Sequence, residues 1–123
     1  MDRKIVLAID DNEIQLDIFQ HTLSGMYDVR VVTSASSALK YLNEDKADII
    51  LLDIEMPNVS GFDFLKDIRK VISYYDVPII IVSAHNDREF LEQARKSSAF
   101  DVLGKPVKPE LLFSAIEKAL AGR

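Results

Sequence analysis

The chain has 123 residues, the length of one compact domain with a real hydrophobic core. Hydrophobic residues make up 48% and charged residues 28%, which argues against disorder, and a net charge of −5 without any Lys/Arg run argues against direct nucleic-acid binding. The absence of cysteine excludes disulfides, thiol catalysis and thiolate metal sites, and two histidines are too few for a multi-histidine zinc site.

Short apolar runs alternate along the chain with segments of helical periodicity. The third and fourth runs are continuously aliphatic, so these two strands are expected to be buried on both faces. The five strands are expected at Ile5–Ile9, Val29–Val32, Ile49–Leu52, Val77–Val82 and Val102–Leu103. The helices are expected at residues 13–24, 36–44, 61–72, 87–97 and 109–121.

Helix-start signals support three of these helices. Ser34 or Ser36 can cap the second helix. Asn86 and Glu89 have the spacing of a capping box before the fourth helix. Pro109 suits the first position of the fifth helix, because its fixed φ is helical and its missing N–H is not needed there.

Strands that alternate with helices indicate right-handed crossovers and a parallel sheet covered on both faces. We therefore expect an α/β fold: a doubly wound (βα)₅ three-layer sandwich, flavodoxin-like, with a parallel sheet of order 2-1-3-4-5. The aliphatic runs are too short to cross a bilayer, and no signal peptide precedes the first strand. We expect one soluble, cytoplasmic domain over residues 1–123, with no output domain and no membrane contact.

Polar residues follow the strands at the edge where sites form in such folds. Asp10 and Asp11 follow the first strand, Asp53 the third, Ser83 the fourth and Lys105 the fifth. These side chains should converge, because the carboxyl ends of parallel strands share one edge. Three neighbouring carboxylates stay ionised only beside a cation, and oxygen ligands suit Mg²⁺. A metal, a hydroxyl and a lysine could surround a phosphoryl group, with Asp53 as its nucleophile.

These motifs resemble the receiver domain of bacterial two-component response regulators. The matching stretches are "DD" after the first strand, "DIEMP" with Gly61 eight residues past its Asp, "SA" after the fourth strand and "KP" after the fifth. The resemblance implies that Asp53 accepts a phosphoryl group from a phosphohistidine on a sensor histidine kinase or a histidine phosphotransfer protein. Such a domain is not an enzyme toward other substrates: it catalyses only its own phosphorylation and dephosphorylation.

The resemblance also implies the metal ligands. Asp10, Asp11 and Asp53 would hold Mg²⁺, directly or through water, together with the backbone carbonyl of Glu55. Mn²⁺ would be able to replace Mg²⁺.

Further roles follow for the other strand-end residues. Ser83 and Lys105 would bind the phosphoryl group, and the Lys105–Pro106 bond would be cis. Phosphorylation would then change the face made by the fourth helix, fifth strand and fifth helix, which would contact an output domain, a partner protein or a second copy.

Two pairs of residues have open interpretations. Glu55 and His85 are expected beside the phosphate, where they would either tune its lifetime or be solvated loop residues. The apolar set of the first helix is too broad for one stripe. Ile18, with Gln15 beside it, would dock the kinase, or the helix simply packs widely on the core.

The chain departs from the family pattern at three places. Val102 stands where an aromatic switch residue is common, and Phe100 is a candidate to replace it. Ser98 stands where glycine commonly ends the fourth helix, which predicts either a strained cap or a different ending. On the fifth helix, Ala115 and Glu117 occupy positions where arginines of a dimer face are expected, so that dimer is in doubt.

Two other classes of protein remain as alternatives. A flavodoxin-like electron carrier has the same strand order, but "DDNE" would repel the flavin phosphate, and a flavin spectrum would decide. A haloacid-dehalogenase-type phosphatase also has an Asp nucleophile and Mg²⁺. That family has a second Asp two residues on, where this chain has Glu55.

Overall fold

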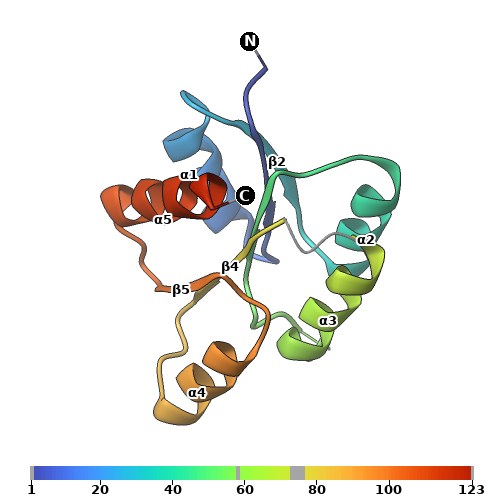
Figure 1. Ribbon diagram of the computed structural model, residues 1–123, viewed down its shortest axis with the longest axis vertical. Helices are drawn as coiled ribbons and strands as arrows, with labels where there is room; N and C mark the ends of the chain where they lie inside the picture. Colours follow the sequence, from blue (N-terminus) through green and yellow to red (C-terminus); the bar gives the residue numbers. More distant parts are fainter. Residues whose placement is uncertain (1, 58, 73–76, 123) are drawn as a thin grey trace.

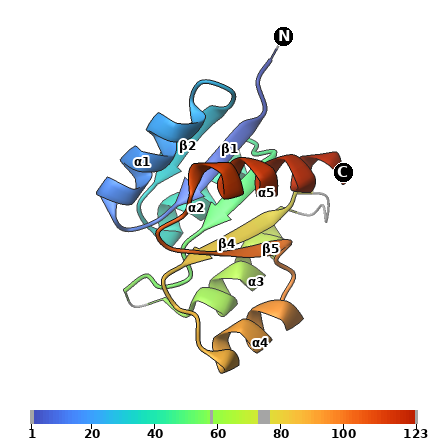
Figure 2. The ribbon, with the colours of Figure 1, turned by 90° about the vertical axis from the view of Figure 1, so that its left-hand side faces the viewer.

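A parallel sheet forms the centre of the molecule in the computed structural model, which describes residues 2–57, 59–72 and 77–122. The strands are β1 (Ile5–Ile9), β2 (Asp28–Val32), β3 (Ile49–Leu52), β4 (Ile79–Ser83) and β5 (Asp101–Gly104). The helices are α1 (Glu13–Leu23), α2 (Ala35–Glu44), α3 (Gly61–Val71), α4 (Arg88–Lys96) and α5 (Pro109–Ala121). The sheet order β2-β1-β3-β4-β5 confirms the predicted fold. Helices α1 and α5 cover one face and α2, α3 and α4 the other (Figures 1 and 2).

The central strands supply the core on both sides of the sheet. Every residue of β3 and β4 is buried, which confirms that these strands are covered on both faces. One set of alternate side chains packs under α2, α3 and α4: Ile50, Leu52, Ile79 and Ile81. The other set packs under α1 and α5: Ile49, Leu51, Ile80 and Val82. Within the described ranges, no helix is long and apolar enough to cross a bilayer.

The strand register brings the strand-end residues to one edge. Ile9 pairs with Leu52, so Asp10 and Asp53 are the next residues of adjacent strands. At the neighbouring strands Ser83 pairs with Gly104, and the Lys105 N–H donates to the Ser83 carbonyl over 2.9 Å. Backbone hydrogen bonds therefore fix where the site's side chains originate.

Five element starts differ from the prediction: those of β2, α2, α4 and β5 by one residue and that of β4 by two. Strand β4 begins at Ile79 rather than Val77, because Pro78 has no N–H for the ladder, although its carbonyl accepts from Ile50. Helix α4 is capped by Asp87, whose carboxylate accepts the Phe90 N–H, so the predicted Asn86 cap is wrong.

The other helix-start predictions fit the structure. The Ser34 hydroxyl caps α2, and Pro109 is the first residue of α5.

Helix α4 ends without a left-handed residue at its C-cap. The cap Ser97 is extended, with φ −81° and ψ 179°, and its hydroxyl donates to the Ala94 carbonyl. The next residue, Ser98, is held by the side chain of Arg69 from α3. The conformation of Ser97 and these contacts of Ser98 describe the helix end, and the two alternatives for a serine at position 98 stay a prediction.

Candidate functional site

Three carboxylates meet at the carboxyl edge of the sheet. Asp10, Asp11 and Asp53 each offer an oxygen, and these oxygens lie within 4.8 Å of one another. Asp10 and Asp53 are 1% and 5% exposed, while Asp11 is open to solvent. Asp10 Oδ1 accepts the Asn12 N–H, and Asp53 Oδ1 accepts the Glu55 N–H over 3.0 Å. These local turns fix both buried carboxylates just beyond their strands.

Lys105 is the cation that the fold places against this cluster. Its Nζ lies 2.9 Å from Asp10 Oδ2 and 3.5 Å from Asp53 Oδ2. Burial would lower the pKa of Lys105, but the hydrogen bond to Asp10 and the charge of Asp53 outweigh that effect and raise it. Lys105 is therefore protonated at neutral pH. The Lys105–Pro106 bond is cis, as expected.

One lysine does not neutralise the three carboxylates. Burial is the main effect that raises the pKa of Asp53, to about 6, and the charge of Asp10 adds to it. The Glu55 N–H and the charge of Lys105 act in the opposite direction. A further positive charge would relieve this repulsion, and a set of oxygen donors on hard carboxylates fits Mg²⁺. Asp10, Asp11 and Asp53 thus fit a divalent cation in number, atom type and spacing.

A second network joins the loop after β3 to the start of α4. The buried Ser83 hydroxyl donates to Glu55 Oε1 over 2.7 Å and accepts the His85 N–H over 3.0 Å. His85 Nδ1 lies 3.8 Å from Glu55 Oε1, and its Nε2 contacts the Asp87 carboxylate. The Phe90 N–H, and then His85, lower the pKa of Asp87. Glu55 and His85 therefore connect the Ser83 hydroxyl to the cap of α4.

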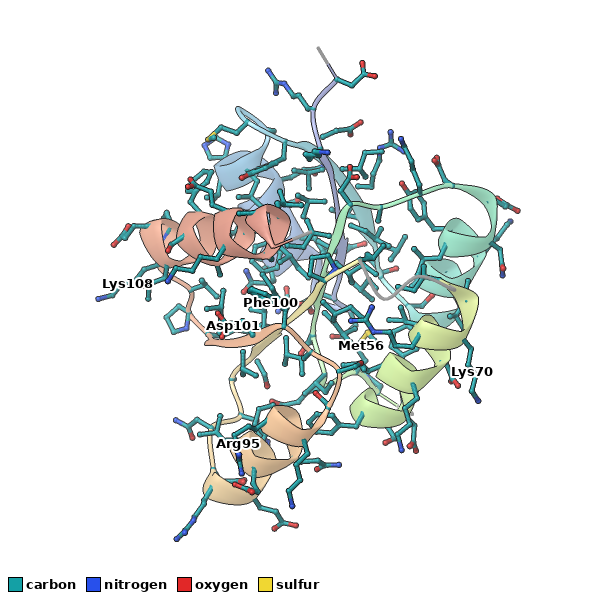
Figure 3. The ribbon with its side chains drawn as sticks, in the orientation of Figure 1. Met56, Lys70, Arg95, Phe100, Asp101 and Lys108 are labelled. Carbon is teal, nitrogen blue, oxygen red and sulfur yellow. The ribbon has the colours of Figure 1, made fainter. Side chains whose placement is uncertain are left out.

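The side chains near the proposed switch position are arranged differently from the sequence-based hypothesis, in which Phe100 would replace an aromatic residue at position 102. Val102 is partly buried against the core under α4, and Phe100 is 48% exposed just before β5 (Figure 3). The ring that contacts His85 belongs to Phe90 of α4, with centroids 5.0 Å apart. The sequence analysis did not identify this contact, which depends on how the loop after β4 packs on α4.

The proposed docking surface lies on α1, whose apolar residues are partly exposed and partly buried. Ile14 and Ile18 are 72% and 51% exposed, and Gln15 is half-buried. The rest of the set belongs to the core: Leu16, Phe19 and Leu23. On α5, Ala115 is buried and Glu117 is exposed.

Comparisons with known proteins cover nearly the whole chain. The family model described as the response regulator receiver domain matches residues 6–117. The two-component response regulator ARR10 of Arabidopsis thaliana is 36% identical over 110 residues, which are 87% of this chain but 19% of ARR10. The two-component response regulator ORR3 of Oryza sativa subsp. indica is 32% identical over 106 residues, 85% of this chain and 81% of ORR3. This chain thus spans about a fifth of the longer relative.

Solved structures show the same architecture. The chemotaxis protein CheY4 of Vibrio cholerae superposes with a TM-score of 0.88 at 28% identity, over 96% of this chain and 99% of the other. A response regulator receiver domain protein from Clostridium thermocellum gives a TM-score of 0.86 at 30% identity, over 97% and 95%.

Proposed function

Because the chain belongs to the response regulator receiver domain family, we propose that it accepts a phosphoryl group on Asp53 and signals through the resulting change in structure. The observation that carries this assignment is the position of Asp53. It is buried beside Asp10 at the carboxyl edge of the sheet, and the Lys105 ammonium lies within reach of both carboxylates.

The two oxygens of Asp53 have different surroundings. Oδ1 accepts the Glu55 N–H, which fixes the orientation of the carboxylate, and Oδ2 faces Lys105. In the proposed reaction Oδ2 attacks the phosphorus of a phosphohistidine. A P–O bond forms, the P–N bond breaks, and its electron pair leaves with the imidazole, which takes up a proton. Lys105 is placed to donate to the phosphoryl oxygens, and its partial burial strengthens that interaction.

Asp10, Asp11 and Asp53 are the proposed ligands of Mg²⁺, with the Glu55 backbone carbonyl as a further oxygen donor and Mn²⁺ as an effective replacement. When bound, the ion supplies positive charge that stabilises negative charge on the transferred oxygens. The carboxylates hold their positions through the protein's own bonds: the Asn12 N–H and Lys105 on Asp10, and the Glu55 N–H on Asp53.

The Ser83 hydroxyl can report phosphorylation because it has one proton to donate. It now donates that proton to Glu55, so a new bond to a phosphoryl oxygen requires it to release Glu55. His85 contacts both Glu55 and Asp87, so this exchange reaches the cap of α4. We propose that the face of α4, β5 and α5 changes in this way and then contacts an output domain, a partner protein or a second copy.

The same residues provide a proposal for phosphoryl lifetime. The Glu55 and His85 side chains are about half exposed and lie over the Ser83 hydroxyl. In that position they would contact or exclude the water that attacks the aspartyl phosphate.

The proposed donor is a sensor histidine kinase or a histidine phosphotransfer protein. Its docking surface would be the exposed side of α1 at Ile18, with Gln15 beside it. The proposed activity is limited to this chain's own phosphorylation and dephosphorylation, in the cytoplasm, without direct binding to nucleic acid or membrane.

The assignment is tested by Mg²⁺-dependent labelling with acetyl phosphate, followed by intact-mass spectrometry. The parent and an Asp67→Asn control, which changes an exposed carboxylate on α3, are expected to take up one phosphoryl group per chain. Asp53→Asn is expected to remain unlabelled, and EDTA is expected to prevent labelling of the parent. Equal labelling of the parent and Asp53→Asn would refute the acceptor, and steady turnover of a phosphomonoester would favour a phosphatase.

A further inference from the structure

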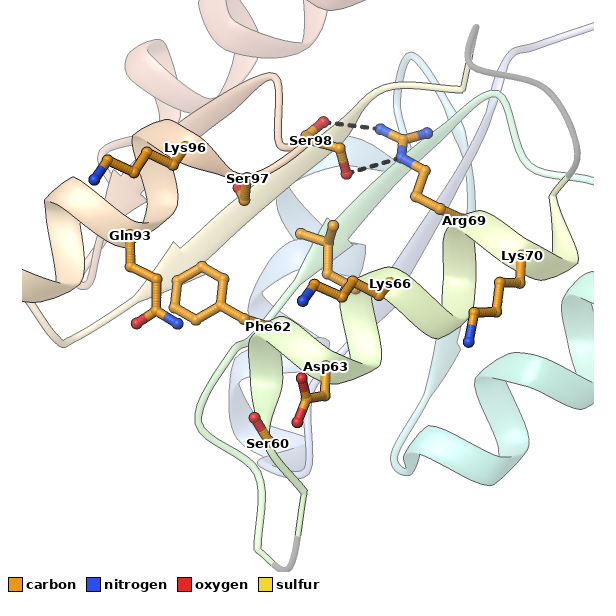
Figure 4. A pocket seen from close by; sticks show the side chains of 11 residues that line it. Ser60, Phe62, Asp63, Lys66, Arg69, Lys70, Gln93, Lys96, Ser97 and Ser98 are labelled. Atoms are coloured by element: carbon orange, nitrogen blue, oxygen red, sulfur yellow. Dashed lines mark hydrogen bonds between the residues drawn. The ribbon is translucent and has the colours of Figure 1, made fainter.

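A groove between α3 and α4 lies outside the residues assigned to phosphorylation (Figure 4). Its volume is about 830 Å³, within the range of sites that bind small organic molecules. Helix α3 contributes Phe62, Leu65 and Lys66 to its walls, and α4 contributes Gln93 and Lys96. Among the described residues that line the groove, none belongs to the acidic cluster.

Arg69 lines the groove and joins α3 to the segments before β4 and after α4. Its Nε and Nη2 donate to the Ser98 hydroxyl and carbonyl over 3.1 and 3.0 Å. Its Nη1 donates to the Val77 carbonyl over 2.6 Å. Three nitrogens of one guanidinium therefore tie α3 to the segment that follows α4, at one end of the groove. A ligand would meet a groove that is already formed, which reduces the entropy lost on binding.

The inner part of the groove is apolar. Leu65 is 2% exposed, and the half-buried ring of Phe62 packs on the Phe90 ring of α4, with centroids 5.7 Å apart. The partly exposed ring of Phe62 therefore offers an apolar surface to a flat group, and the buried Leu65 lies beneath it. Gln93 and Ser60 add polar atoms at the margin (Figure 4).

The charge around the groove is opposite in sign to that of the whole chain. Lys66, Lys70 and Lys96 line it beside Arg69, and Asp63 is the one carboxylate among the described lining residues. Lys96 lies 3.9 Å from Glu92, whereas Lys66 and Lys70 have no ion pair within the described part of the chain. On a protein with a net charge of −5, such a cationic surface favours an anionic ligand.

We propose that the α3–α4 groove is a binding site for a small amphipathic anion. A flat apolar body would lie on Phe62, and a carboxylate, sulfonate or phosphate group would pair with Lys66, which extends across the middle of the groove (Figure 4). This binding needs neither phosphorylation nor a metal ion. Its test is therefore independent of the proposed signalling function.

The test uses 1-anilinonaphthalene-8-sulfonate as an anionic probe and N-phenyl-1-naphthylamine as its uncharged counterpart. Fluorescence titration of the full chain is expected to show saturable binding of one sulfonate probe per chain. Lys66→Glu is expected to weaken that binding about 5- to 10-fold, as expected for reversing one exposed ion pair. Lys40→Glu, the same charge change on exposed α2, is expected to leave it unchanged.

Two further measurements place the probe. Amide shifts in ¹⁵N–¹H spectra are expected to change at Phe62, Lys66 and Gln93, and the uncharged probe is expected to bind more weakly than the sulfonate. Non-saturable binding, equal weakening by Lys40→Glu, equal affinity for both probes, or shift changes confined to other elements would each overturn the proposal.

Discussion

Replacing Asp53 with asparagine is expected to stabilise the metal-free protein at neutral pH. Burial and the charge of Asp10 raise the pKa of Asp53 from 3.8 to about 6. At about 1.4 kcal/mol per pKa unit, this difference of about two units corresponds to about 3 kcal/mol that the ionised carboxylate costs the folded state. An amide of the same shape carries no such charge, and Lys105 keeps its 2.9 Å contact with Asp10.

The sign of this effect defines its pH window. Because the folded-state pKa lies above the unfolded one, the folded protein binds the proton more tightly. Stability from Asp53 is therefore fully present below about pH 4 and is lost as the pH rises through about 6. The advantage of Asp53→Asn over the parent is expected to be largest above pH 7 and to vanish near pH 4.

Urea unfolding in EDTA at pH 7.5 and at pH 4 measures this difference. With a slope of about 2 kcal/mol/M, the midpoint of Asp53→Asn at pH 7.5 is expected to be about 1.5 M higher than that of the parent. Added Mg²⁺ is expected to reduce the gap, since it stabilises the parent more. Equal midpoints at pH 7.5, or an equal gap at both pH values, would refute the argument that the buried charge is responsible.

Three other substitutions test separate contacts. Gly61→Ala places a Cβ about 2.2 Å from the Ile54 carbonyl oxygen, so it is expected to lower the free energy of unfolding by about 1–3 kcal/mol and to slow acetyl phosphate labelling; an unchanged melting curve would contradict the close approach. Arg69→Ala removes charged donors from buried and loop carbonyls and is expected to cost about 2–3 kcal/mol in urea unfolding, whereas an exposed Arg95→Ala is expected to be nearly neutral. His85→Ala is expected to change the dephosphorylation rate of the labelled protein in a ³²P-decay assay; an unchanged rate would show that His85 does not tune the lifetime.

The group of residues that meets at the edge of the sheet could be predicted from the sequence. Asp10, Asp53 and Lys105 follow strands and Ser83 ends one, and parallel strands bring their carboxyl ends to one edge. The cis Lys105–Pro106 bond, which the family resemblance implied, is present. The meeting of the strand-end residues depends on the topology that alternating strands and helices impose.

Side-chain partners between distant elements depended on the tertiary structure. The sequence placed Glu55 and His85 near the phosphate, but only packing showed that Ser83 donates to Glu55, 28 residues away. Likewise Arg69 donates a hydrogen bond to Ser98, which lies 29 residues further along the chain. Both residues line the α3–α4 groove.

The same limit applied to the cap of α4. Asn86 and Asp87 are both suitable caps by residue type, and the choice of Asp87 depends on where the chain leaves β4. A periodic pattern identifies which face of an element is buried, whereas a hydrogen bond also requires two atoms to meet within about 3 Å. The sequence therefore determined the fold and which residues lie at its strand ends, and the tertiary structure decided which side chains interact.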